Sequence, residues 1–256
     1  MNVKYKNPPI NELVMGIYFK EPILKFRSEH VGIYWSKIKD EFPKSSQKMM
    51  IGGVDIQSTD EIFPMPRFWF MTDDDVYLIQ VQRNAFIFNW RRQNEEYPHY
   101  DPLKKKFDEH FAKFEKFCQE HFGVSQIGIE RCELIYINIV SDEEYFSSLA
   151  DTKNVIPSFK PLSFGTDENN LRNFNLSYVY SYDENMTLAV SLQTRRHKKT
   201  DKDTLYFDLK SSGALSQSTK SEADSWFDRA HDAIGDAFNS LTNPDVQHQH
   251  WQPRED

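Results

Sequence analysis

Three short runs of large apolar and aromatic residues, separated by two tight turns, constrain the fold of this chain more than any other feature. Asp73 and Asp74 separate the first two runs, and Arg83 and Asn84 separate the last two. Asp and Asn tolerate the backbone angles of a tight turn and bond to their own main chain. The segment therefore predicts three consecutive antiparallel strands, a β-meander, at residues 67–72, 75–82 and 85–92.

The rest of the chain either alternates in the same way or repeats its apolar residues at helical spacing. Alternation predicts strands at 12–20, 133–140, 171–182, 186–192 and 204–210, and either an irregular loop or a weak strand at 49–56. Spacings of three and four residues predict amphipathic helices at 28–41, 101–122 and 219–241. We expect a connecting stretch at 141–170 and a frayed tail from Asn243.

These elements predict an α+β fold, with two antiparallel β-meanders and three amphipathic helices packed on one side. Their order divides the chain into a β-α-βββ-α-β half at residues 1–145 and a βββ-α half at residues 146–256. We expect the two halves to form one integrated globular unit. The sequence leaves open whether they share one sheet.

Composition narrows the class of protein. A chain of 256 residues can bury a substantial core, and 39% hydrophobic with 27% charged residues suits a soluble globular protein. A net charge of −8 argues against a protein that coats nucleic acid or anionic lipid, although it leaves room for a local basic patch. No apolar run suits a signal peptide or a membrane span, so we expect a cytoplasmic protein. Cys118 and Cys132 are expected to be reduced and buried.

Five short motifs follow one another along the chain. They are Asn7-Pro8-Pro9-Ile10-x-Glu12, Asp40-Glu41-Phe42-Pro43, Leu78-Ile79-Gln80-Val81-Gln82, Tyr136-Ile137-Asn138 and His231-x-x-Ile234-x-x-x-Phe238. In their order and spacing, over essentially the whole chain, they resemble a sporadically distributed family of uncharacterised bacterial proteins of about this length. The resemblance implies no mechanism, because that family has no established activity. Its patchy distribution suits an accessory gene, such as one in a phage-defence or toxin–antitoxin locus.

The motifs of common catalytic and cofactor sites do not occur in the sequence. The pair Gly52-Gly53 lacks the following helix and lysine of a phosphate-binding loop. No Gly-x-Ser-x-Gly elbow is present, and no Cys-x-x-Cys or His-Glu-x-x-His spacing offers a metal site. We therefore expect a non-enzymatic protein without a metal or a cofactor.

Three weaker candidates have simpler explanations. His248 and His250 resemble part of a metal site, but we expect two solvated side chains. The carboxylates of Asp73 to Asp75 lie where the meander needs a turn, and the turn is the preferred interpretation. His231 could act as a general base. Beside the apolar face of the last helix, we expect it instead to anchor that helix to a carbonyl or carboxylate of the sheet.

The best candidate for a partner-binding surface is the first meander. Alternate residues of a strand project from the same face, and Arg and Trp often anchor interfaces. An equally favoured alternative is that one face packs under the helices while the polar groups line an edge or bond buried main chain. The candidate residues are Arg67, Trp69, Gln80, Gln82, Phe88, Asn89, Trp90 and Arg91.

A short basic run at the tip of the second meander is a candidate anion-binding site. It carries no interleaved aromatic residue for base stacking, so a solvated turn is the preferred interpretation. The run is Arg195, Arg196, His197, Lys198 and Lys199.

Together these observations favour a non-enzymatic protein that binds another protein, such as the product of a neighbouring gene, in a chaperone-like or antitoxin-like role. One alternative is an RNA-binding or RNA-processing protein that uses Arg67, Arg91, Arg92 and the basic run. Another is a small-molecule sensor with a pocket under the last helix. Exposed aromatic residues would be consistent with a homodimer.

Overall fold

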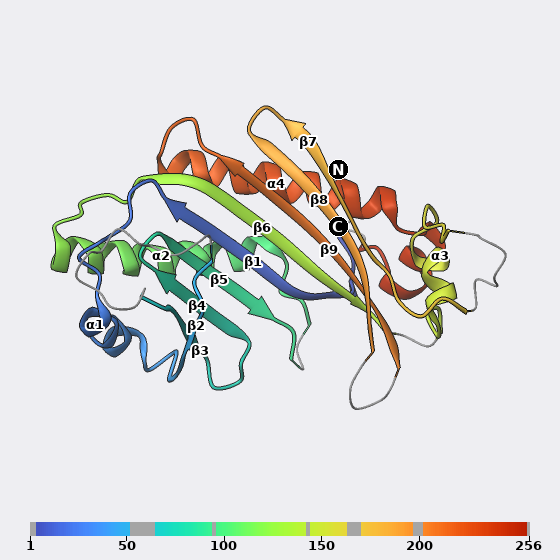
Figure 1. Ribbon diagram of the computed structural model, residues 1–256, viewed down its shortest axis with the longest axis horizontal. Helices are drawn as coiled ribbons and strands as arrows, with labels where there is room; N and C mark the ends of the chain where they lie inside the picture. The colour runs from blue at the N-terminus through green and yellow to red at the C-terminus, as the bar shows by residue number, and fades with distance from the viewer. Residues whose placement is uncertain are drawn as a thin grey trace. The chain divides into compact units, whose positions relative to one another are not determined.

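A computed structural model describes residues 4–51, 65–93, 96–141, 144–162, 170–196 and 202–254 (Figure 1). The strands are β1 (Ile10–Phe19), β2 (Lys44–Lys48), β3 (Arg67–Met71), β4 (Tyr77–Gln82), β5 (Ala85–Arg91), β6 (Ile129–Val140), β7 (Asn175–Asp183), β8 (Met186–Arg196) and β9 (Asp203–Ala214). The helices are α1 (Ser28–Ile38), α2 (Tyr100–Phe122), α3 (Thr152–Val155), α4 (Lys220–Leu241) and α5 (Pro244–Val246), with single turns η1 (Leu149–Asp151) and η3 (Gln247–Trp251).

Within the described residues, nine strands follow one hydrogen-bonded order, β2-β3-β4-β5-β1-β6-β9-β8-β7. The pairings of β2 with β3 and within both meanders are antiparallel. The antiparallel α+β class is therefore confirmed. The sheet is larger than two meanders, however, because β1 and β6 stand between them in the strand order. Two short helices, α3 and α5, also accompany the three predicted long ones.

The chain divides into two compact units. Unit 1 consists of residues 1–12, 134–212 and 228–256, and unit 2 of residues 13–133 and 213–227. The division passes through β6 and α4, whereas the sequence pattern placed a boundary after residue 145. No helix of the described residues is long and apolar enough to cross a membrane.

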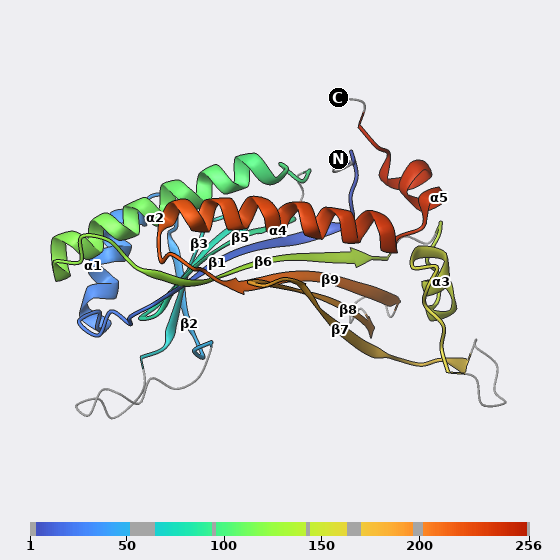
Figure 2. The same ribbon diagram turned by 90° about the horizontal axis from the view of Figure 1, so that it is seen from above.

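Unit 2 is built on the first meander, with α1 and α2 packed against the same face of it (Figure 2). Phe86 of β5 contacts a row of phenylalanines on α2, with its ring centroid 5.5 Å from that of Phe114. Tyr34 of α1 contacts Phe70 of β3 at 5.8 Å and the same Phe114 at 5.3 Å. The apolar stripe of α2 thus forms the core it predicts. Gly123 ends the helix in the left-handed conformation, with φ of +73°, which glycine adopts without strain.

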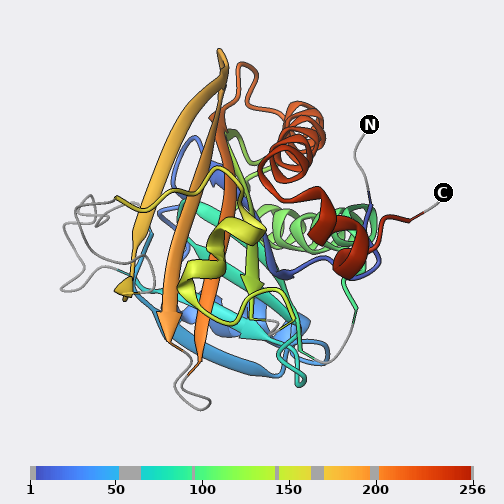
Figure 3. The same cartoon turned by 90° about the vertical axis from the view of Figure 1, so that its right-hand side faces the viewer.

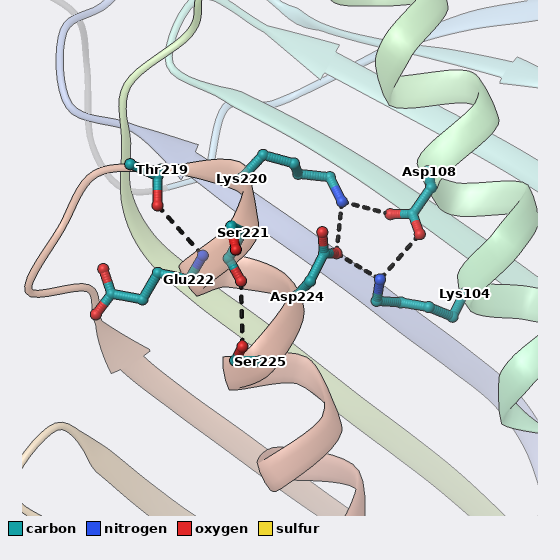
Figure 4. Close-up of polar contacts among 8 residues, drawn as sticks. All are labelled: Lys104, Asp108, Thr219, Lys220, Ser221, Glu222, Asp224 and Ser225. Carbon is teal, nitrogen blue, oxygen red and sulfur yellow. Dashed lines mark hydrogen bonds and ion pairs between the residues drawn. The ribbon is translucent and has the colours of Figure 1, made fainter.

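The first turn of α4, which belongs to unit 2, is attached to α2 by a closed ring of alternating charges (Figure 4). Lys104 Nζ lies 2.9 Å from Asp108, and Lys220 Nζ lies 2.6 Å from Asp108 and 2.5 Å from Asp224. A bond from Lys104 to Asp224 completes the ring. Each charge faces two of opposite sign, so every charge of the ring is paired within it. The ring therefore serves to position the two helices.

Unit 1 is built on the second meander, with the later turns of α4 on one side of it (Figure 3). Leu188, Val190 and Leu192 alternate along β8 and are buried, as the pattern predicts. Phe207 of β9 stacks on Phe238 of α4 at 5.9 Å.

The predicted frayed tail from Asn243 is wrong. Residues 244–251 form α5 and η3, and Trp251 is only 2% exposed. Its ring lies 5.0 Å from Phe238 and 6.2 Å from Tyr5, so the end of the chain joins an aromatic cluster of unit 1. Burial of the large indole surface offsets the entropy cost of ordering the tail.

The segment at 49–56, expected to be an irregular loop or a weak strand, is described only at residues 49–51, which belong to no strand. A strand that was not predicted, β2 at Lys44–Lys48, lies just before it and pairs with β3 despite its polar sequence. Residues 52–56, including Gly52 and Gly53, lie outside the described residues.

Candidate functional site

The face of the first meander that is turned away from α2 carries most of the predicted binding residues. Trp69 lies directly opposite Gln80, and Leu78 lies opposite Asn89. Directly opposite side chains share a face, and so do residues two apart on one strand. The residues of this face, called the polar face below, are Arg67, Trp69, Gln80, Gln82, Asn89 and Arg91.

Phe88 and Trp90 do not belong to this surface, which corrects the sequence prediction. Both are buried, at 0% and 1% exposure, on the side that carries α1 and α2. Phe88 stacks on His110 of α2, and Trp90 contacts Tyr97. Adjacent strand residues point to opposite faces, so Asn89 and its two neighbours cannot share one.

Two members of the polar face have structural roles. The Gln82 amide donates to the main-chain oxygen of Ile51 at 2.9 Å and accepts from its N–H at 3.1 Å. This pair of bonds fixes the chain just after β2. Asn89 Oδ1 accepts from Gln80 Nε2 at 2.7 Å.

Several polar atoms of the same face are buried without a hydrogen-bond partner among the described residues. They are Arg67 Nε, Trp69 Nε1, Gln80 Oε1, and Nε and Nη2 of Arg91. The Gln80 side chain is only 5% exposed. A buried donor or acceptor left unpaired costs about 1–3 kcal/mol, so several on one face need an explanation.

Positive charge gathers at the same place. Lys48 Nζ lies 5.0 Å from the centroid of the Trp69 ring, and Arg67 Cζ lies 5.5 Å from it. Within the described part of the chain, neither cation forms an ion pair. Burial lowers the pKa of Arg67, and the neighbouring Tyr18 partly opposes the effect. The three residues Lys48, Arg67 and Trp69 are called the cationic cluster below.

Residues that sequence analysis did not single out border this face from β1 and β6. Arg131 Cζ lies 3.6 Å from the centroid of the Tyr18 ring, and the Tyr18 hydroxyl donates to Glu133 at 3.4 Å. Burial, and then the Glu133 carboxylate, raises the pKa of Tyr18. The alternation of the charged residues Arg131 and Glu133 along β6 is the sequence signal that could have singled them out.

Lys48 was also missed, because the weak strand was predicted to begin one residue after it. Pairing with β3 brings Lys48 opposite Arg67.

The basic run is only partly described. Arg195 and Arg196 end β8, and residues 197–199 lie outside the described residues. The Arg195 guanidinium lies 4.2 Å from the centroid of the Tyr206 ring. Burial raises the pKa of the nearby Asp208 carboxyl to about 6, and Arg195 acts against this rise. Arg195 is thus engaged with its own sheet.

The histidine candidates agree with the sequence predictions only in part. Tyr136 and His231 Nδ1 share a hydrogen bond of 2.9 Å, so the anchor is a hydroxyl rather than a carbonyl or carboxylate. His248 is exposed, as expected, whereas His250 is not a solvated side chain, because it is only 20% exposed and lies 3.5 Å from Glu144.

The three consecutive aspartates serve the turn. Asp74 accepts from Thr72 at 2.5 Å and from the Val76 N–H at 3.0 Å, and the Thr72 bond is the main cause of its lowered pKa. Lys44 pairs with Asp75 at 3.2 Å. Across the described residues, no group of three or more His, Cys, Asp or Glu side chains could hold a metal ion.

Comparison with known proteins adds little. No protein family and no curated protein matches this chain. Among solved structures, it is similar to DynU16, described as a protein in the dynemicin biosynthetic locus. The identity is 11% and the TM-score 0.26, with 90% of this chain and 96% of that chain covered. A likeness of this size carries no argument about function.

Proposed function

We propose that this protein is a non-enzymatic binding protein and that its partner presents an anionic group to the polar face. The unpaired polar atoms around the cationic cluster carry the proposal. Arg67 Nε and Trp69 Nε1 are donors, so they call for an acceptor. A carboxylate or phosphate supplies acceptors with charge, and charge-assisted hydrogen bonds are stronger than neutral ones.

The partner's group also needs a donor. Gln80 Oε1, on β4, is an unpaired acceptor, and Gln80 lies directly opposite Trp69 of β3. An oxyanion with a neighbouring N–H or O–H would accept hydrogen bonds from the donors on β3 and donate one to the acceptor on β4. An acidic side chain of a partner protein, with its own amide N–H, has this arrangement.

A partner protein is favoured over RNA for two reasons. The chain carries a net charge of −8, which repels a polyanion over its length, whereas one acidic side chain feels chiefly the local cluster. The unpaired atoms are also buried, so they suit a group that projects inward more than a broad backbone. The chaperone-like or antitoxin-like role suggested by the family resemblance stays a prediction.

A small-molecule sensor is the second candidate. A cavity of about 280 Å³ in unit 1 is lined mainly by apolar residues, including Leu241 at the end of α4, and also by Ser158 and Lys160. Ligand pockets usually range from about 300 to 1,000 Å³, so this cavity is small for the purpose. A free anionic metabolite at the polar face would serve the same function with the cationic cluster.

Native mass spectrometry of protein co-expressed with its neighbouring genes tests the proposal. We expect a bound protein or small acid on the wild-type chain and its loss in Arg67→Gln and Trp69→Phe. Trp69→Phe removes the indole N–H and keeps an aromatic ring. Arg229→Gln is the matched control, because Arg229 is an exposed arginine of α4. Equal occupancy in Arg67→Gln and Arg229→Gln would show that the polar face is not the site.

Salt dependence separates the sources of the anion. A single acidic group predicts a shallow fall of affinity with salt, whereas RNA predicts a steep one. Added mass that matches a neighbouring gene product supports a protein partner, and added mass of a few hundred daltons supports a metabolite. Bound oligonucleotide would favour RNA instead.

A further inference from the structure

β7 is an edge strand with large exposed side chains. It is the last strand in the sheet order, and its nine residues include four large hydrophobic residues that are at least half exposed. They are Tyr178 at 51%, Val179 at 68%, Tyr180 at 55% and Tyr182 at 50%. Long exposed edges of this kind pair with another strand unless the sequence prevents it.

β2, at the opposite end of the strand order, is an edge strand that is protected against pairing with another chain. β2 is five residues long, and Lys44 and Lys48 stand at its two ends. Short length and lysines are two devices by which natural edges avoid pairing. β7 has neither of these devices, and it contains no proline. Its pairing with β8 is irregular only at the end of the strand, between Ser181 and Asp183, so the regular stretch is residues 175–181. The chain therefore protects one edge and leaves the other available.

The charges around β7 are arranged for an antiparallel copy of itself. Arg172 precedes the strand, whereas Asp183 is its last residue and Glu184 follows in the turn. In a parallel pair of two such strands, like charges would lie side by side. In an antiparallel pair, the arginine of each strand lies beside the carboxylates of the other, and opposite charges across strands are stabilising.

We propose that β7 pairs antiparallel with β7 of a second copy of this chain. Pairing centred on Tyr178 places Tyr180 opposite Leu176 of the second copy, and it brings the carboxylates that follow β7 toward the segment of the second copy that contains Arg172. The large even-numbered residues then lie on one face of the joined sheet. The interface is self-complementary, as a two-fold dimer requires. It uses unit 1 only, so it stands independently of the binding proposed for unit 2.

Sedimentation equilibrium over a range of protein concentrations tests the pairing. We expect the wild-type chain to approach twice its monomer mass and Tyr180→Lys to remain monomeric, since each lysine would then place its charge opposite the apolar Leu176 of the second copy. Ser221→Lys is the matched control, because it adds the same charge at an exposed position of α4. Circular dichroism checks that each variant is folded.

A charge swap tests the strand direction. Arg172→Glu should raise the dimer dissociation constant about tenfold, and adding Glu184→Arg should restore it. A wild-type chain that stays monomeric at every soluble concentration would overturn the proposal, as would a dimer that Tyr180→Lys leaves intact. A monomer that binds a foreign extended peptide along β7 would assign the edge to a different partner and equally overturn it.

Discussion

At the scale of single residues, the polar face combines burial with unmet hydrogen-bonding capacity. Arg67 Nε and Trp69 Nε1 are buried donors that have no hydrogen-bond partner among the described residues. Natural proteins pair nearly all such groups, and exceptions concentrate where a ligand completes the set. This reasoning predicts that the free protein would be more stable without the arginine.

Arg67→Met tests this prediction. We expect the free energy of unfolding of the unbound protein to rise by about 1 kcal/mol, because a buried donor without a partner is replaced by an apolar side chain of similar length. Urea titration of Arg67→Met and wild type gives the difference. Arg229→Gln should leave stability nearly unchanged. A loss of stability in Arg67→Met would mean that the guanidinium already has its partner in the free protein.

His110 is a second residue whose surroundings have a measurable consequence. It is 2% exposed on α2, between Phe42 and Phe88, with Nε2 at 3.3 Å from Glu41. Burial lowers its pKa from 6.5 to about 4, against the opposing effect of the Glu41 carboxylate, while Lys113, Lys106 and Glu109 contribute less. The folded protein therefore holds this imidazole neutral.

Stability should fall as the pH is lowered from about 6.5 to 4. In this window the unfolded chain binds a proton at His110 and the folded chain does not, so acid favours unfolding by up to about 3 kcal/mol. His110→Phe removes the titrating group and should flatten this part of the urea-unfolding profile. Asp208 acts in the opposite direction, because its pKa is raised to about 6 in the folded state. An unchanged profile in His110→Phe would contradict the assignment.

At the scale of elements, the charge ring shows how α4 and α2 are held in register within unit 2. Its members are only partly buried, with side-chain exposures from 14% at Lys104 to 36% at Asp224. Isolated surface ion pairs contribute about 0–1 kcal/mol, so any larger effect must come from the closed arrangement. Coupling between the members is therefore the informative quantity.

A double-mutant cycle on Lys104→Met and Asp224→Asn measures that coupling. Each single change leaves one unbalanced charge in the ring, whereas the double variant leaves the neutral pair Lys220–Asp108. We expect each single variant to lose about 1 kcal/mol of stability and the double variant to lose less than their sum. Asp236→Asn, an exposed aspartate of the same helix, is the control. Strictly additive losses of stability would show that the charges of the ring act as independent surface pairs.

At the scale of the whole molecule, the chain carries two different kinds of surface, one in each unit. Unit 2 presents the polar face with its cationic cluster, and unit 1 presents the open edge of β7. Both were visible in the sequence only in part. The tyrosines of β7 were predicted to alternate, but their exposure depends on which strand ends the sheet.

Local rules determined most of the secondary structure from the sequence alone. Turn residues fixed the ends of β3 to β5, alternation fixed β8, and the spacing of phenylalanines together with Gly123 fixed α2, because each signal acts between residues a few positions apart. Tertiary structure decided which face of the first meander is covered. Phe88 and Ile87 are equally apolar, and only the packing of α2 selects the face of Phe88 and leaves Arg67, Trp69 and Gln80 on the other. Strand periodicity gives two faces but cannot assign them, since that choice depends on residues distant in sequence. The same reason explains the ordered tail, where Trp251 finds Tyr5 and Phe238 only in the folded chain.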